Sequence, residues 1–247
     1  MDDATGAPLY SSTFPIFAVT VDLVVLTIRD DELCVLLVTR GSEPFAGRMA
    51  LPGGFVLARE DLDEAAAREL GEETGIALAR APVLEQLKTY GAPDRDPRPE
   101  RVVTVAHLAV LPEAGEAVGG SDAAAAHWLP VRRVDTGEAA LAFDHRQIVA
   151  DGVARAQAKL EYTALATAFL PSQFTINALR QVYETVWDTR LDRGNFHRAV
   201  AGSRKGFLTA VEGQTVQVRR FQAQLFRRRE GLEPTGLLDY PVRRPQL

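Results

Sequence analysis

One stretch, Gly54 to Ile76, constrains this chain more than any other, because its glycines and charged residues fall at fixed offsets. It reads GFVLAREDLDEAAARELGEETGI. From about Asp61 it carries strong helix formers, with acidic residues in the first turn and Gly75 placed as a helix stop. The pattern predicts a helix over about residues 61–74.

Three glutamates share one face of this predicted helix. Each helical residue advances about 100°, so Glu69, Glu72 and Glu73 lie within an arc of roughly 100°. Carboxylates crowded in this way repel one another unless a cation is bound, and their hard oxygens suit Mg²⁺ or Mn²⁺, which in turn binds diphosphate. An apolar strip on the opposite side consists of Leu62, Ala66 and Leu70. We therefore expect a metal–diphosphate site that opens into a cleft.

A solvated acidic face is the ordinary explanation of a charge run, but here the flanking glycines also fit a known signature. From Gly54 to Ile76 the stretch resembles the box of the Nudix hydrolases at every position. The resemblance implies that the metal ligands are Glu69, Glu72 and Glu73. It implies that the catalytic residues are Glu60, Arg68, Glu72 and Glu73.

Composition indicates a globular protein with room for two domains: 247 residues, 46% hydrophobic and 25% charged. The single cysteine, Cys34, excludes a disulfide framework within the chain. The N-terminus opens with Asp2 and Asp3, unlike a secretory signal, and the apolar stretch Ile16 to Ile28 is too short for a bilayer and is broken by Asp22. We expect a cytoplasmic protein with no membrane partner.

Charge is divided unevenly along the chain. Residues 1–160 hold 15 Lys/Arg and 25 Asp/Glu, a net charge of −10, whereas residues 161–247 hold 13 and 8, a net charge of +5. An acidic first part and a basic second part favour two domains with different partners, and nucleic acid is the expected partner of the second.

The first 145 residues or so alternate strand and helix patterns. Residues 18–28 and 33–39 form a predicted hairpin, and further strands are predicted at 83–90, 102–111 and 127–131, with a helix at 144–159. This predicts an α/β sandwich in which a mixed sheet lies between helices.

From Leu160 the pattern changes to helices followed by a basic ribbon. A helical stretch to Leu170 is followed by Thr175, a good N-cap for an amphipathic helix, and by a second helix over residues 195–203. Residues 206–211 and 215–227 form a predicted ribbon with its turn at 212–214. This order predicts a winged helix-turn-helix domain.

Four further motifs accompany the box: Asp94 to Arg98, Phe143 to His145, Phe174-Thr175 and Leu191 to Phe196. Together they resemble the Nudix-related transcriptional regulators of NAD metabolism over roughly residues 16–230. That resemblance implies a Nudix-like ADP-ribose-binding domain (residues 1–155), a winged helix DNA-binding domain (residues 156–247) and a homodimer. Many of these regulators carry an eroded box, whereas the box here is intact, which leaves hydrolysis of ADP-ribose open.

Candidate ligand-binding residues surround the box. The loop Asp94 to Arg98 is stiffened by prolines, and its arginines can fork onto phosphate or ribose oxygens. The candidates are Arg40, Arg48, Gly53, Gly54, Arg95, Asp96 and Arg98. His107 and His145 lack ligand spacing, so we expect structural roles for both.

Candidate DNA-binding residues cluster at the start of the second predicted helix of the winged helix domain. There Arg193, Asn195, His197 and Arg198 are suited to base edges in the major groove. Phosphate contacts are predicted for Arg204, Lys205, Arg219 and Arg220.

The sequence thus favours an ADP-ribose-responsive repressor of NAD-metabolism or related pentose genes that binds a palindromic duplex as a homodimer. One alternative is an Mg²⁺-dependent ADP-ribose pyrophosphatase whose second domain serves only dimerisation. Another is an RNA-directed hydrolase, which the winged helix argues against.

Overall fold

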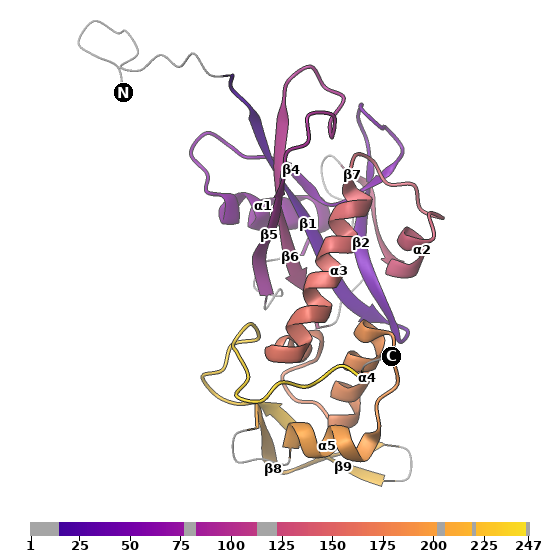
Figure 1. The fold of residues 1–247 in the computed structure, drawn as a ribbon, viewed down its shortest axis with the longest axis vertical. Helices are drawn as coiled ribbons and strands as arrows, with labels where there is room; N and C mark the ends of the chain where they lie inside the picture. Colours follow the sequence, from indigo (N-terminus) through magenta and orange to yellow (C-terminus); the bar gives the residue numbers. More distant parts are fainter. Residues whose placement is uncertain (1–14, 77–82, 113–122, 202–205, 219–220, 246–247) are drawn as a thin grey trace, which may run out of the picture.

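The computed structural model describes residues 15–76, 83–112, 123–201, 206–218 and 221–245. Figure 1 shows two bodies along the long axis, a sheet flanked by helices above and a small helical body with a two-stranded ribbon below. Helix α3 (His145–Tyr162) runs from the face of the sheet down to the lower body.

The larger sheet is mixed, as predicted. Its main path runs β3-β2-β1-β6-β5, with β4 paired to β1 and β7 paired to β2. Strand β1 is parallel to β6, and the other pairings are antiparallel. The strands are β1 Ala18–Arg29, β2 Glu32–Arg40, β3 Met49–Ala50, β4 Gly53–Phe55, β5 Val83–Tyr90, β6 Val102–Val110 and β7 Ala123–Pro130.

The hairpin of β1 and β2 closes through Asp30 and Asp31, both with positive φ (49° and 61°). Positive φ at both central residues is the geometry of a type I′ turn, which asparagine-like side chains tolerate. Strand β7 begins at Ala123, four residues before the predicted strand, and pairs with β2 along that length.

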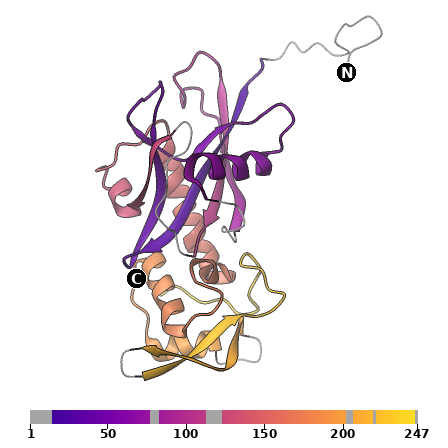
Figure 2. The same ribbon diagram turned by 180° about the vertical axis from the view of Figure 1, so that it is seen from behind.

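Helices cover both faces of the sheet, and each face has its own apolar cluster. Helix α1 (Leu62–Thr74) covers one face, where Ala65, Ala66 and Leu70 pack against alternate residues of β1 such as Leu23. Figure 2 shows α1 in front of the sheet, on the side opposite α3. The strands therefore alternate between two buried faces, and the predicted sandwich is confirmed.

The second apolar cluster, on the face of the sheet that α3 covers, continues into the lower body. It includes Val24 and Leu26 of β1, Leu160 of α3, and Tyr183 and Trp187 of α4 (Ile176–Trp187). The Trp187 Nε1–H donates to the Gln157 carbonyl oxygen of α3 at 2.9 Å. One continuous core thus joins the two bodies.

The lower body is a winged helix, as predicted. Its further elements are η2 (Leu165–Phe169), α5 (Arg193–Ala201), β8 (Leu208–Val218) and β9 (Phe221–Arg228). The short helix α2 (Val131–Asp135) belongs to the upper body, where it contacts β2, β7 and α3. The predicted helix over 160–170 is interrupted, because α3 ends at Tyr162 and a 3₁₀ turn, η2, follows Thr163.

The predicted turn at residues 212–214 is wrong. Strand β8 continues through these residues to Val218, which pairs with Phe221. The pairing register shifts between Ala210 and Thr215, and Gly213 has a positive φ of 68°. The residues that resemble a turn therefore form an irregularity within the strand.

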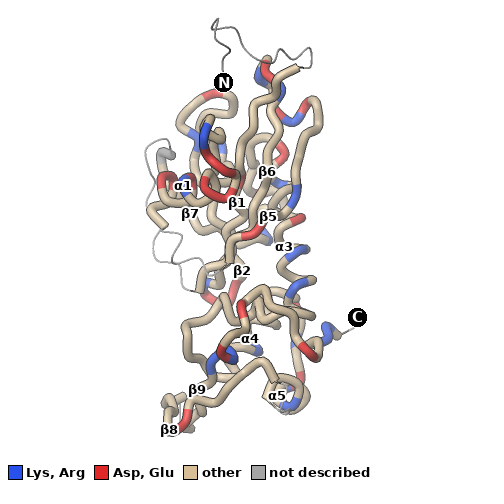
Figure 3. Tube along the Cα trace, turned by 90° about the vertical axis from the view of Figure 1, so that its left-hand side faces the viewer, with Lys and Arg blue, Asp and Glu red and all other residues tan. Residues whose placement is uncertain are grey.

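Charge is separated along the molecule. Figure 3 shows acidic residues gathered at α1 in the upper body, and basic residues at α5 at the opposite end. In the part of the chain that the structure describes, no helix is long and apolar enough to cross a membrane.

Candidate functional site

Helix α1 begins and ends at the residues that its sequence indicates. Asp61 and Glu64 form a capping box, and Gly75 ends the helix in the left-handed conformation (φ 68°). Between these two ends, Glu69 and Glu73 lie against Gly54 and Gly53 of β4. The predicted helix over 61–74 is confirmed.

Arg68 gathers the box carboxylates. Its Nε donates to Glu60 at 2.6 Å and its Nη2 donates to the other Glu60 oxygen at 2.9 Å. Its Nη1 donates to Glu69 at 2.7 Å and to Glu72 at 3.1 Å. The hydrogen bond from Arg68 lowers the pKa of Glu60 to about 2, so Glu60 stays ionised.

Two glycines let α1 approach the strand beside it. A Cβ on Gly53 would lie 2.1 Å from the Val21 backbone oxygen, and its φ of 156° disfavours other residues, while a Cβ on Gly54 would displace the Glu69 carboxylate, 2.3 Å away. The backbone N–H of Gly53 donates to Glu73 at 2.9 Å. Burial raises the pKa of Glu69, which the charge of Arg68 offsets in part.

The donors suit a hard divalent cation, but they are engaged with other partners. Glu69 and Glu72 bond Arg68, and Glu73 accepts from Gly53. Among the residues that the structure describes, no three His, Cys, Asp or Glu side chains are arranged to hold a metal ion. Arg68 bonds one oxygen each of Glu69 and Glu72, and the metal-ligand role of Glu69, Glu72 and Glu73 stays a prediction.

A cleft of about 340 Å³ opens beside the box. Its lining includes Arg40, Arg98 and Phe143. The Arg40 guanidinium lies 4.9 Å from the centre of the Phe143 ring, and Arg98 lies 5.7 Å from it. Burial lowers the pKa of Arg40, and the charge of Arg98 lowers it further. Two like charges held together in this way attract an anion.

The predicted ligand loop is tied down by ion pairs. Arg95 is buried and donates to both carboxylate oxygens of Asp144 (3.0 and 2.8 Å), and it lies 3.6 Å from Asp22. Asp96 accepts from the Arg98 backbone N–H at 3.0 Å and pairs with its guanidinium at 2.8 Å. Arg95 therefore fixes the loop to the start of α3, and Arg98 is the more exposed arginine of the loop.

His145 lies beneath the cleft as a structural side chain. Its Nδ1 accepts from the Leu51 backbone N–H at 2.9 Å, and its Nε2 lies 3.5 Å from Asp22. Burial lowers the pKa of His145. The expected structural role therefore agrees with these contacts, and His107 likewise is buried beside Asp63 at 3.2 Å.

The cleft brings together most of the predicted ligand residues. Arg40, Gly53, Gly54, Arg95, Asp96 and Arg98 all line it. Arg48 is exposed, stacks on Phe45 at 5.3 Å and is not among the lining residues. Sequence reasoning missed Asp22 and Phe55 as lining residues, and it named Phe143 and Asp144 only within a motif, without a role at the site. For Asp22 the available signal was an acid inside the apolar run of β1, because a buried charge requires a partner.

The second candidate surface is the exposed side of α5. Asp192 caps this helix, since its side chain accepts from the Asn195 backbone N–H at 2.8 Å. Phe196 and Val200 are buried, and Phe196 packs edge-on against Tyr183. The exposed residues are Arg193, Asn195, His197 and Arg198. Arg204, Lys205, Arg219 and Arg220 lie outside the described residues.

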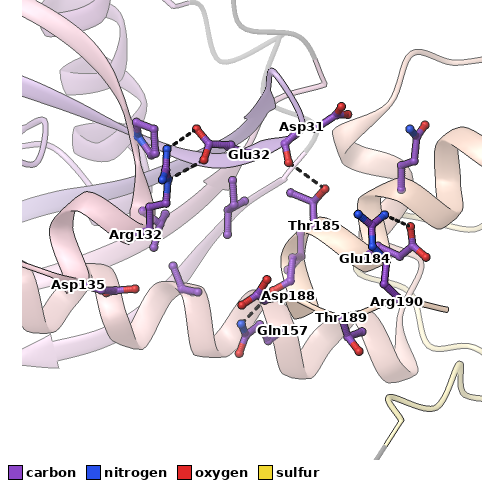
Figure 4. Close-up of a pocket in the computed structure, with 16 residues that line it drawn as sticks. Asp31, Glu32, Arg132, Asp135, Gln157, Glu184, Thr185, Asp188, Thr189 and Arg190 are labelled. Carbon is purple, nitrogen blue, oxygen red and sulfur yellow. Dashed lines mark hydrogen bonds and ion pairs between the residues drawn. The ribbon is translucent and has the colours of Figure 1, made fainter.

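The turn between α4 and α5 is organised by one buried glutamate. Glu184 forms an ion pair with Arg180 and accepts from the Leu191 backbone N–H at 2.7 Å. Figure 4 shows Glu184 in a cleft of about 620 Å³ between the β1–β2 hairpin and the winged helix. In the same cleft Thr185 donates to the Asp31 carbonyl oxygen at 3.4 Å, so the two bodies touch at this turn.

Two family models match separate parts of the chain. The NUDIX domain model matches residues 17–152, and the NrtR DNA-binding winged helix domain model matches residues 166–228. The ADPR responsive transcriptional repressor NtrR of Acinetobacter baylyi is 31% identical over 248 residues, which cover 100% of this chain and 93% of that protein.

Two solved structures of Shewanella oneidensis NrtR are also similar. The crystal structure complexed with a 27mer DNA is 28% identical with a TM-score of 0.74, covering 91% of this chain and 99% of that chain. The NUDIX domain complexed with ADP ribose is 33% identical with a TM-score of 0.54, covering 63% of this chain and 99% of that chain.

Proposed function

This chain belongs to the Nudix family and joins its Nudix domain to an NrtR-type winged helix, and from this we propose that it is an ADP-ribose-responsive transcriptional repressor. Its regulated genes are those of NAD metabolism or of related pentose use. The observation that carries the proposal is the continuous core, which runs from the sheet through α3 into α4. Ligand in the Nudix cleft is thereby coupled mechanically to the DNA-binding body.

ADP-ribose fits the cleft by charge and shape. Its diphosphate would lie between the box glycines and the pair Arg40 and Arg98, and Phe55, which is 46% exposed at the rim, offers a face for the adenine ring. Asp96 would orient Arg98, and Arg95 would hold the loop. A bound Mg²⁺ or Mn²⁺, held by Glu69, Glu72 and Glu73, would neutralise diphosphate charge.

Double-stranded DNA would be read by α5. The base edges would be reached by Arg193, Asn195 and His197. Arg198 donates a hydrogen bond to the Asn195 side chain and would contact a base edge or a phosphate. The basic residues Arg204, Lys205, Arg219 and Arg220 would meet phosphates. A homodimer would place two such helices about one helical turn apart on a palindromic site.

Ligand would release the DNA. Closure of the cleft around ADP-ribose would shift the two DNA-binding bodies of the dimer, so that their spacing no longer matches the palindrome. We propose domain extents of 1–155 and 156–247, supported by the change in charge and by the two separate family matches, with α3 crossing the boundary as the shared element. A chromosome-binding repressor of this kind would work in the cytoplasm.

The test is fluorescence anisotropy at fixed salt on a duplex from the region upstream of the chain's own gene. A scrambled duplex of equal length is the control. We expect sequence-specific binding that saturating ADP-ribose weakens at least tenfold. Equal affinity with and without ADP-ribose would remove the proposal.

The intact box favours a second function, hydrolysis of ADP-ribose to AMP and ribose 5-phosphate. Water would attack one phosphorus of the diphosphate and break the P–O–P bond. Glu60 and Arg68 would position Glu72, to which Arg68 donates, and the Gly53 backbone N–H would position Glu73. Formation of AMP in the presence of Mg²⁺, abolished by Glu73→Gln, would establish turnover. If Glu73→Gln still binds DNA, turnover and repression are separate functions.

A further inference from the structure

The two-stranded ribbon of β8 and β9, which we call the wing, has one apolar face and one polar face. In the antiparallel pair β8–β9, Val216 lies opposite Ala223 and Val218 lies opposite Phe221. Residues directly opposite in such a pair project from the same face, so these four side chains form one apolar face. We call these four residues the wing face.

The wing face is open to solvent. Phe221 is 78% exposed, Val218 is 43% exposed and Val216 is 40% exposed. At the base of the ribbon, by contrast, Phe226 packs against the core and pairs with Phe174. Exposed apolar groups of this size, gathered at one end of a ribbon, mark an interaction surface.

The other face of the same ribbon is polar and internally bonded. The Gln222 side-chain amide donates to Gln217 at 2.7 Å, and the Thr215 hydroxyl donates to Gln222 at 2.9 Å. Polar groups that bond one another are less available to a partner. The face that remains for a partner is therefore the apolar one.

Charge and position favour DNA as that partner. The wing lies beside α5 at the end of the molecule away from the sheet, as Figures 1 and 2 both show. The described part of the ribbon holds Arg227 and Arg228 against one acid, Glu212, and the chain from residue 161 onward carries a net charge of +5. A polyanion is attracted to this end of the molecule.

We propose that the wing face is a wedge for the minor groove of operator DNA, with Phe221 as its leading side chain. Apolar wedges of this kind enter between base steps, unstack them in part and kink the duplex by roughly 20–90°. The inference rests on the proposed DNA-binding function. It adds that the operator would be recognised in part by how easily its base steps deform. Base steps that unstack easily would be preferred beneath Phe221.

The experiment compares Phe221→Ser and Phe221→Leu with the unaltered chain on the upstream duplex. Leu237→Ser is the matched control, because Leu237 is a 72% exposed apolar residue away from the ribbon. Affinity is measured by anisotropy at several salt concentrations, and bending is measured by energy transfer between the labelled ends of the duplex.

We expect Phe221→Ser to weaken operator binding about tenfold and to reduce the bend. The slope of affinity against salt should stay unchanged, because that slope counts phosphate contacts and a wedge makes none. Phe221→Leu should retain the bend and bind within about threefold of the unaltered chain, since leucine also serves as a wedge. Leu237→Ser should match the unaltered chain.

Three results would overturn the proposal. Unaltered affinity and bending in Phe221→Ser would show that the wing face does not enter the groove. A loss of dimer mass in Phe221→Ser without DNA, measured by sedimentation, would assign the face to a second copy of the chain. No specific binding by the unaltered chain would remove both the proposed function and the wedge, whereas the first two results leave repression intact.

Discussion

Arg68 holds three of the box carboxylates together. It bonds Glu60, Glu69 and Glu72 together, and the bond with Glu60 raises the pKa of the guanidinium. In this arrangement the acidic cluster is neutralised by the protein itself.

Arg95 gives the first prediction. Arg95→Met should destabilise the fold by about 2–3 kcal/mol, below the usual cost of breaking a buried pair because Asp144 is a quarter exposed on its side chain. The added change Asp144→Leu should restore part of that loss, because it removes the charge left unpaired at Asp144, whereas buried Asp22 still lacks the Arg95 guanidinium that lay 3.6 Å away. Thermal unfolding measures both.

ADP-ribose affinity in the same variants separates two roles of Arg95. If Arg95 positions the loop through Asp144, the double variant should recover affinity together with stability. If Arg95 binds phosphate directly, affinity should stay low although stability returns, and the positioning role would be wrong.

His145 gives a prediction on pH. Its pKa is lowered by burial, so the unfolded chain binds a proton more readily as the pH falls below about 6.5. The contribution of neutral His145 to the free energy of unfolding is therefore complete above about pH 6.5 and is lost as the pH falls toward the pKa of the folded state. Each unit by which the fold lowers this pKa corresponds to about 1.4 kcal/mol. Melting temperatures from pH 7.5 to 5 should fall more steeply than in His145→Asn.

Asparagine is the matched replacement because its side-chain oxygen can still accept from the Leu51 N–H. Equal slopes in both proteins over this pH range would contradict the assignment of the proton to His145.

For single residues, the sequence predicted which side chains lie at the site better than it predicted which side chains bond one another. The box residues were predicted at their positions because their spacing is local to one helix. The Arg95–Asp144 pair joins residues 49 apart in sequence and depends on how the loop meets α3, which no local pattern contains. Asp22 was visible as an acid in an apolar strand, but its two partners were not.

At the scale of elements, α5 shows how a short helix depends on its cap. It has nine residues and only two buried side chains, so Asp192 at its start supplies a large share of its stability. Asp192→Ala should cost about 1 kcal/mol and weaken operator binding about fivefold by fraying the helix. Anisotropy and helix content by circular dichroism measure this.

The control for the cap is Asp192→Asn, which keeps the acceptor and removes a charge that repels phosphate. It should bind DNA at least as tightly as the unaltered chain. Weaker binding by Asp192→Asn than by Asp192→Ala would mean that Asp192 does not act as a cap.

Element boundaries were predicted where caps and periodicity agree, as in α1 and α4. The two-stranded ribbon was predicted correctly, but its turn was placed at the wrong residues. The error arose because Gly213 does adopt the left-handed conformation that a turn requires. A glycine of this kind serves a bulge inside a long strand equally well, and only pairing with β9 decides between the two.

At the scale of the whole molecule, the two sites lie at opposite ends of one core. Helix α3 starts beneath the ligand cleft, at Asp144 and His145, and ends at the winged helix, where Gln157 bonds Trp187. In the proposed mechanism, α3 would carry a displacement of the cleft floor to the DNA-binding body. Thr185 and Asp31 form a second contact between the bodies.

Coupling between two sites is reciprocal, so the DNA must affect the ligand as the ligand affects the DNA. The most direct measurement is the affinity for ADP-ribose by calorimetry, in EDTA to stop metal-dependent turnover, with saturating upstream duplex or with a scrambled duplex. The account predicts that ADP-ribose binds at least tenfold more weakly, or about 1.4 kcal/mol, when the upstream duplex is bound. Equal affinity with both duplexes would contradict it.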